Sequence, residues 1–261
     1  MNAYETLPRE EQSKVDRLLS DTAANGGLAP VDLDAFWRDQ DIARADPFSP
    51  DCPQCCFGAS LNWKCVYAEL GLKEDYWRYQ HDEPWALDVA KRYNDVAERI
   101  VGRRLLNEKP RDPARVWPEV KALHDIFEAR NVWEGGPAGS WWLHPSANTP
   151  GDRRYQHSDS AMGHLLPQLA ELDLTGTNFG PTLSVAEIRR HCPNAVIDGQ
   201  LAPFTYSRNE TANMVAEFLR DFAHAREARG LNFATAGSIN NGTRLTSMRL
   251  LMAAIQRHGK Y

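Results

Sequence analysis

Four segments in the second half of the chain combine side chains that acid–base catalysis and anion binding require. Each contains serine, glycine or proline and follows a short apolar run typical of a β-strand; the segments are residues 157–160, 178–182, 198–203 and 236–243. His157 and Asp159 are the predicted catalytic pair, because imidazole titrates near neutrality and a neighbouring carboxylate can orient it. The same two side chains could also hold a divalent metal ion, and the sequence leaves open whether any metal is bound.

Polar side chains in the other three segments are predicted to bind substrate. These residues are Asn178, Gln200, Ser238 and Asn240. Amide and hydroxyl groups donate hydrogen bonds to substrate carboxylates or to a developing anion, which is effective in a cleft that holds little water. A structural alternative stays open, because Ser160, Asp198 and Thr243 belong to the residue types that cap helices and close turns.

The elements that must position these segments alternate between two patterns. Strand-like runs are predicted at 155–158, 174–178, 195–197 and 231–235, and amphipathic helices at 162–172, 185–191, 209–229 and 245–257. Such alternation predicts four βα units with parallel strands. Because parallel strands gather the loops at their carboxyl ends along one edge, the four polar segments are expected to converge on one cleft.

The first half of the chain is predicted to be mostly helical. Its clearest helix carries apolar residues every three to four positions (Val89, Tyr93, Val96 and Ile100); it should begin near Asp82-Glu83-Pro84 and end at residues 107–110. Further helices are expected around residues 15–19 and 33–37 and after Arg111, and residues 141–143 suit a strand or a buried turn. The predicted organisation is a helical segment, 1–133, followed by βα units, 134–261, with a single domain as the alternative.

The predicted fold class is α/β, of the (β/α) TIM-barrel type. Four units in residues 151–261 use about 28 residues each, so eight would consume the whole chain. Because the first half is mostly helical, we expect a partial or open barrel with fewer than eight strands. Its exposed strand edge should then be covered by the N-terminal helices or by a second subunit.

Four cysteines lie close together in the sequence, at Cys52, Cys55, Cys56 and Cys65. The first two have the C-x₂-C spacing of zinc and iron–sulfur ligands, but no second such pair follows. The neighbouring aromatic residues instead indicate small buried side chains. We therefore expect that the four thiols do not share a metal.

Composition and charge exclude several function classes. With 42% hydrophobic and 25% charged residues, the chain is typical of a globular protein. The net charge is −5 and the charges alternate along the sequence, which disfavours nucleic acid as a partner. No apolar run approaches the length of about 20 residues that a membrane span needs. Without a pattern typical of a signal peptide, and with an odd number of cysteines, a cytoplasmic protein with reduced thiols is expected.

Three motifs resemble the C-terminal half of the uroporphyrinogen decarboxylase-like superfamily, which also contains corrinoid methyltransferases. Gly199-Gln200-Leu201-Ala202-Pro203 is similar to the Gly-Asn-Leu-Asp-Pro run of the decarboxylases. The run 236–239 falls at their late Gly-His-Gly loop, and His157-Ser158-Asp159 at the His-x-Cys of the methyltransferases. Ser238 and Asp159 replace the histidine and cysteine of those motifs. Full-length members of that superfamily have further strands and helices before the counterpart of His157. By that resemblance, this chain looks as though an internal block is absent.

The resemblance implies a (β/α)₈-type fold and an enzyme, either a lyase that decarboxylates a carboxylated tetrapyrrole or a methyltransferase linked to a corrinoid. The expected ligand is a tetrapyrrole or a small methylated compound, and the expected partners are a corrinoid protein and a second copy of the chain. The alternative is a non-catalytic binding or scaffold protein that retains part of the fold, which the replaced histidine and cysteine positions favour.

Overall fold

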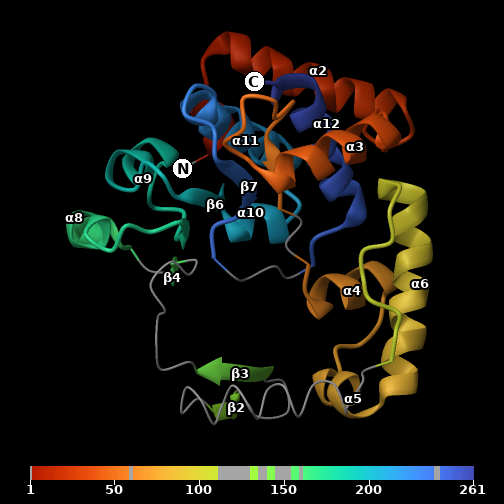
Figure 1. The fold of residues 1–261 in the computed structure, drawn as a ribbon. Helices are drawn as coiled ribbons and strands as arrows, with labels where there is room; N and C mark the ends of the chain where they lie inside the picture. The colour runs from red at the N-terminus through yellow and green to blue at the C-terminus, as the bar shows by residue number, and fades with distance from the viewer. Residues whose placement is uncertain are drawn as a thin grey trace.

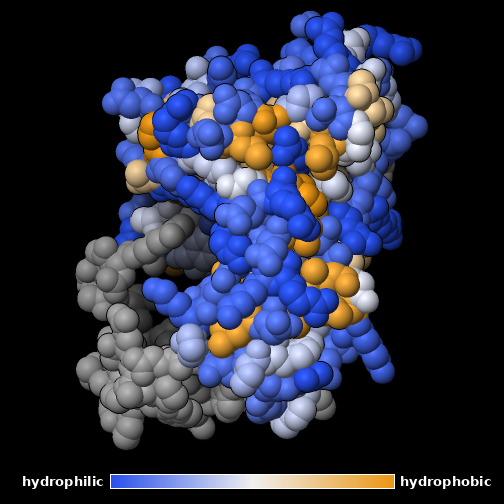
Figure 2. Space-filling model, turned by 90° about the vertical axis from the view of Figure 1, so that its right-hand side faces the viewer, coloured by the Kyte–Doolittle hydropathy of each residue, from blue (hydrophilic) through white to orange (hydrophobic). Residues whose placement is uncertain are grey.

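The computed structural model describes residues 2–58, 61–110, 130–134, 140–144, 154–158, 161–237 and 242–261, of which 130–134 and 140–144 are described by backbone only. Helices precede the sheet in the chain: α1 (Ala3–Thr6), α2 (Arg9–Ala24), α3 (Leu33–Ala45), α4 (Trp63–Leu70), α5 (Tyr76–His81) and α6 (Glu83–Val101). An N-terminal helical region is thus confirmed. Figure 2 looks at the side where α6 lies and shows a mainly hydrophilic surface with scattered hydrophobic spots.

Helix α6 begins where its sequence predicts and ends earlier than expected. The Asp82 side chain accepts a hydrogen bond from the backbone N–H of Trp85, and Pro84 lies in the first turn. Gly102 ends the helix with a φ of 75°, a left-handed conformation that suits glycine. The predicted end at residues 107–110 was therefore wrong, because Gly102 stops the helix first.

Five parallel strands form the main sheet, in the order β1-β7-β6-β5-β4 (Figure 1). They are β1 (Cys56–Phe57), β4 (Tyr155–Ser158), β5 (Gly176–Phe179), β6 (Val196–Leu201) and β7 (Leu231–Thr235). In the described part of the chain this sheet is open, with β1 and β4 at its two edges. A separate antiparallel pair joins β2 (Arg130–Glu134) to β3 (Ser140–His144), so of the two alternatives for residues 141–143 the structure has the strand.

The helices between these strands follow the predicted alternation. They are the 3₁₀ helix η2 (Gly163–Leu165), α8 (Leu166–Ala170), α9 (Val185–His191), α10 (Pro203–Ser207), α11 (Thr211–Ala225) and α12 (Leu245–His258). The single helix predicted at 162–172 was wrong, since Pro167 lies in the first turn of a new helix, α8. Strand β6 is longer than predicted and α11 is shorter.

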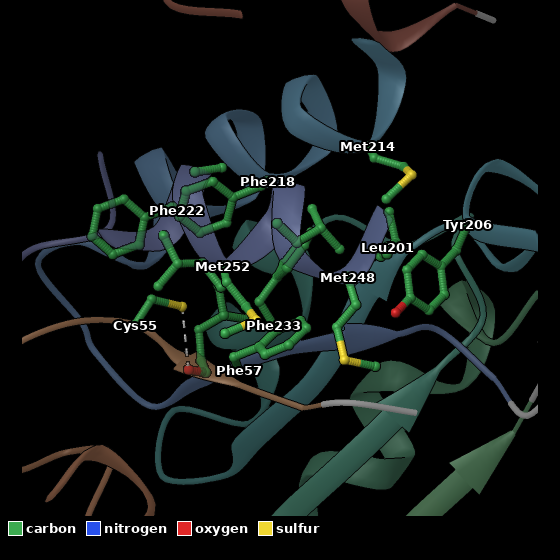
Figure 3. Packing of buried hydrophobic residues seen from close by; sticks show 14 of the residues in the cluster. Cys55, Phe57, Leu201, Tyr206, Met214, Phe218, Phe222, Phe233, Met248 and Met252 are labelled. Atoms are coloured by element: carbon green, nitrogen blue, oxygen red, sulfur yellow. Dashed lines mark hydrogen bonds between the residues drawn. The ribbon is translucent and has the colours of Figure 1, made fainter. Parts of the chain in front are cut away.

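The core lies between the sheet and helices α11 and α12. Phe233 of β7 packs edge-on against Phe218 of α11 at 5.2 Å between ring centroids, and Phe57, Met248 and Met252 surround it (Figure 3). Phe57 and Phe233 are register partners on β1 and β7, so they share this face. Residues from both predicted segments, 1–133 and 134–261, thus contribute to one sheet and one core; the boundary itself stays a prediction.

Helix α3 covers the free edge of β1. The side chain of Gln40, fully buried, accepts the Phe57 N–H at 2.7 Å and donates to the Cys55 carbonyl at 2.9 Å. Arg44 of the same helix donates to the Phe57 carbonyl at 3.1 Å. These side chains occupy the hydrogen-bonding positions that another strand would fill, so the expected covering of a sheet edge by the N-terminal helices is confirmed at β1.

No helix among the described residues is both long and apolar enough to cross a lipid bilayer.

We predict that Gln40→Ala lowers the free energy of unfolding by about 2 kcal/mol, because it leaves two buried backbone groups without partners. Urea unfolding followed by circular dichroism measures the change. Arg38→Ala on the same helix is the control, since that side chain is 68% exposed; its effect should stay within about 0.5 kcal/mol. Equal effects of the two substitutions would contradict the role given to Gln40.

Candidate functional site

The side chain of Asn178 hydrogen-bonds backbone groups at the carboxyl ends of neighbouring strands. From β5, its side-chain amide donates to the carbonyl of Asp198 on β6 at 2.6 Å and to the carbonyl of Thr235 on β7 at 3.0 Å. Its carbonyl oxygen accepts the backbone N–H of Gly237 at 2.8 Å. This buried amide therefore fixes the edge where the polar segments after β5, β6 and β7 begin.

A row of polar side chains crosses the sheet on the face opposite Phe233. Cys56, Asn232 and Asp198 are successive register partners on β1, β7 and β6, and register partners in neighbouring strands point to the same face. The Asn232 amide donates to the Asp198 carboxylate at 2.6 Å, while its own Oδ1 is buried and has no hydrogen-bond partner among the described residues. A carboxylate held by an amide in this way can accept a hydrogen bond from a bound molecule.

Gln200 lies at a separate pocket of about 610 Å³ at the same edge of the sheet. The pocket is formed by the segments that follow β5 and β6 together with α1, α10 and α11. Gln200 is 1% exposed and donates to the carbonyls of Gly180 at 3.2 Å and Leu183 at 2.7 Å, and no residue in the described part of the chain hydrogen-bonds its Oε1. The loop after β5 is thus held in place by the side chain of Gln200.

Buried Glu217 of α11 lines the same pocket. Its carboxylate accepts the Ala202 N–H at 2.6 Å and the Thr205 hydroxyl at 2.8 Å. Burial raises the pKa of this carboxyl, an effect that the two hydrogen bonds oppose. Arg208 and Arg220 also line the pocket, so its wall presents both signs of charge.

The predicted site residues are only partly placed by the structure. His157 lies on β4 with an exposed side chain and is the register partner of Asn178, so the two share a sheet face. Neither residue lines the pocket of Gln200. Asp159, Ser238 and Asn240 lie outside the described residues. The pairing of His157 with Asp159, for catalysis or for a metal, and the role of Ser238 and Asn240 therefore stay predictions.

Sequence reasoning missed the contact between Asp198 and Asn232. Asp198 opens one of the four predicted polar segments, with a cap or turn as its alternative role, and no role is predicted for Asn232. The available signal was the polar Asn232 inside the apolar run 231–235, whose alternation places it on the face opposite Leu231 and Phe233.

The five cysteines are all free and buried. Burial raises the pKa of the Cys55 thiol well above its usual range and that of Cys56 to about 11. The thiols of Cys55 and Cys56 are therefore protonated at neutral pH and are weak nucleophiles. Within the described residues no group of three or more histidine, cysteine, aspartate or glutamate side chains is placed to hold a metal. The absence of a metal shared by the four clustered cysteines stays a prediction, which elemental analysis of the purified protein would test.

Neither a protein-family model nor a curated protein matches this chain.

We predict that Asn178→Ala lowers the free energy of unfolding by about 3 kcal/mol, because three backbone groups at the strand ends lose their partner. Thermal and urea unfolding measure the loss. Thr182→Ala, an exposed position in the next loop, is the control and should change stability by less than about 0.5 kcal/mol. A stable Asn178→Ala protein that has lost only ligand binding would contradict the structural role and favour the predicted contact with substrate.

Proposed function

We propose that this chain is an enzyme of the uroporphyrinogen decarboxylase-like superfamily, with its active centre at the carboxyl edge of the parallel sheet. Its ligand is a tetrapyrrole-type macrocycle, acted on either by decarboxylation of a carboxylated tetrapyrrole or by methyl transfer that involves a corrinoid. The order of the strands is the observation that carries this proposal.

Strands β4, β5, β6 and β7 lie side by side in chain order, and β7 then pairs in parallel with β1, the first strand of the chain. A (β/α) barrel has this cyclic order, in which the last strand adjoins the first. A doubly wound sheet instead reverses its order at a switch point. The order therefore supports an arc of a barrel that, in the described part of the chain, has no strand of the main sheet between β1 and β4.

The motifs of the resemblance also follow strand ends, where that fold would need them. His157 lies in the last half of β4, the run 199–203 spans the end of β6 and the start of α10, and Gly237 follows β7. Loops at the carboxyl ends of barrel strands carry catalytic residues in this architecture. The agreement of three motifs with three strand ends supports the assignment of the family.

The proposed chemistry uses a proton donor and a hydrogen-bonding face. His157, with Asp159 two residues along, would exchange a proton with the substrate. Asp198, held by Asn232 at 2.6 Å, would accept a hydrogen bond from the macrocycle on the same sheet face as Asn178. A corrinoid protein would be the partner in the methyl-transfer reaction.

The test begins with binding. Purified protein is mixed with a carboxylated porphyrin or with cobalamin, and a change in the absorption spectrum reports binding. Uroporphyrinogen is then assayed for loss of carboxyl groups by mass spectrometry, and methylcobalamin with a thiol acceptor for demethylation. We predict that His157→Ala lowers kcat/KM of whichever reaction occurs by about 100-fold or more, while His164→Ala, at an exposed position on η2, leaves it unchanged.

The outcomes separate the candidate functions. Turnover of uroporphyrinogen assigns a lyase, and turnover of methylcobalamin assigns a methyltransferase. Binding of a macrocycle without either reaction assigns the non-catalytic binding protein. That role is consistent with the hydrogen bonds that the Asn178 and Gln200 amides donate to backbone carbonyls of the protein itself. Absence of macrocycle binding overturns the proposal.

A further inference from the structure

A basic pocket lies at the opposite end of the sheet from the candidate site. It has a volume of about 620 Å³ and lies between α2 and the C-terminal end of α12. Helix α12 follows the carboxyl end of β7 and returns toward the start of β1, where the Gly259 carbonyl accepts the Cys55 N–H at 2.7 Å. The pocket is therefore at the amino-terminal end of the strands, remote from the segments that follow their carboxyl ends.

Cations predominate in the lining of this pocket. Lys14, Arg17, Arg257, His258 and Lys260 line it, against a single lining carboxylate, Glu10. Lys14 and Arg257 are each paired with an acidic residue, Glu11 and Asp21, at 2.6 Å. Within the described residues Arg17 and Lys260 have no carboxylate at ion-pair distance, so two positive charges at the pocket are not neutralised by the protein.

The pKa of half-buried His258 is lowered by the positive charges around the pocket as well as by burial. Burial lowers the pKa of its imidazole first, and the charges of Lys14 and Arg257 lower it further; Glu11 raises it, and Arg17 lowers it by less than Glu11 raises it. These cations therefore lie close enough to disfavour another positive charge in the same hollow. In a chain with a net charge of −5, such a concentration of cations is a local feature and not the consequence of a basic composition.

We propose that this pocket binds a phosphate group, either as inorganic phosphate or as part of a phosphorylated small molecule. A phosphate carries about −1.5 to −2 charges at neutral pH and presents three acceptor oxygens, which suits several cations that converge from two helices. Arginine, in addition, matches phosphate oxygens in a bidentate geometry.

A structural role for the same cations makes a different prediction. Arg257 and His258 lie in the last turn of α12, where positive charge stabilises the negative end of the helix dipole. That effect needs no ligand and does not involve Arg17 of α2. Two measurements therefore distinguish the roles: the effect of substituting Arg17 on binding, and the change in the pKa of His258 when phosphate is added.

The experiment titrates inorganic phosphate and pyrophosphate into the full chain and follows the imidazole of His258 by NMR. We expect binding to raise the pKa of His258 by about half a unit or more, because a bound anion favours its charged form. Arg17→Ala should weaken binding by about tenfold or more without changing the stability of the phosphate-free protein. Arg9→Ala, which removes the same charge from the same helix outside the pocket, should change binding less than about twofold.

Three results would overturn the proposal: an unchanged pKa of His258, equal effects of Arg17→Ala and Arg9→Ala, or binding of citrate as tight as that of pyrophosphate. A final arm compares inorganic phosphate with glycerol 3-phosphate in the same titration. Tighter binding of the ester supports a phosphorylated small molecule as the ligand, and tighter binding of the inorganic ion supports phosphate itself.

Discussion

Backbone groups at the edge of an open parallel sheet need hydrogen-bonding partners, and at β1 the buried side chain of Gln40 supplies them. It bonds both the Phe57 N–H and the Cys55 carbonyl, in place of a neighbouring strand. Because β1 is only two residues long, its pairing with β7 alone would leave half of its polar backbone unpartnered. The interaction thus holds β1 in the sheet, and the position of β1 in turn places Cys56 in one row with Asn232 and Asp198 and Phe57 against the core.

The parts of this fold that the sequence predicts are those with a complete local signal. Strand β7 and helix α9 match their predicted bounds, because an alternating run and a capping box at Ser184 and Glu187 are both contained within a few residues. Strand β1 was not predicted. Its two residues lie in a cysteine-rich run that suits a buried turn equally well, and its pairing partner is about 175 residues further along the chain. No periodicity can develop over two residues, so only the tertiary pairing identifies it.

In the candidate site too, the sequence predicts local features but not tertiary contacts. A polar residue at the end of a strand was reason enough to expect substrate contacts from Asn178, yet its three hydrogen bonds go to backbone groups of residues 198, 235 and 237. Local sequence gives the type of side chain available, whereas its partners depend on which strands become neighbours. The basic pocket follows the same logic, because Arg17 and Lys260 are far apart in a chain whose charges alternate and meet only through the packing of α2 and α12.

Helix α12 links the two ends of the sheet physically. Its first residue, Leu245, donates its N–H to Glu69 at 3.0 Å beside the segment that follows β7, and its last turn carries Arg257 and His258 at the basic pocket. Between these ends, Leu250 to Ile255 are all buried, so the helix is packed along most of its length. The hydrogen bonds of Asn178 join β5 to β6, β7 and the segment after β7, and none of them involves α12. The geometry of the strand ends and the position of α12 are thus set by separate interactions.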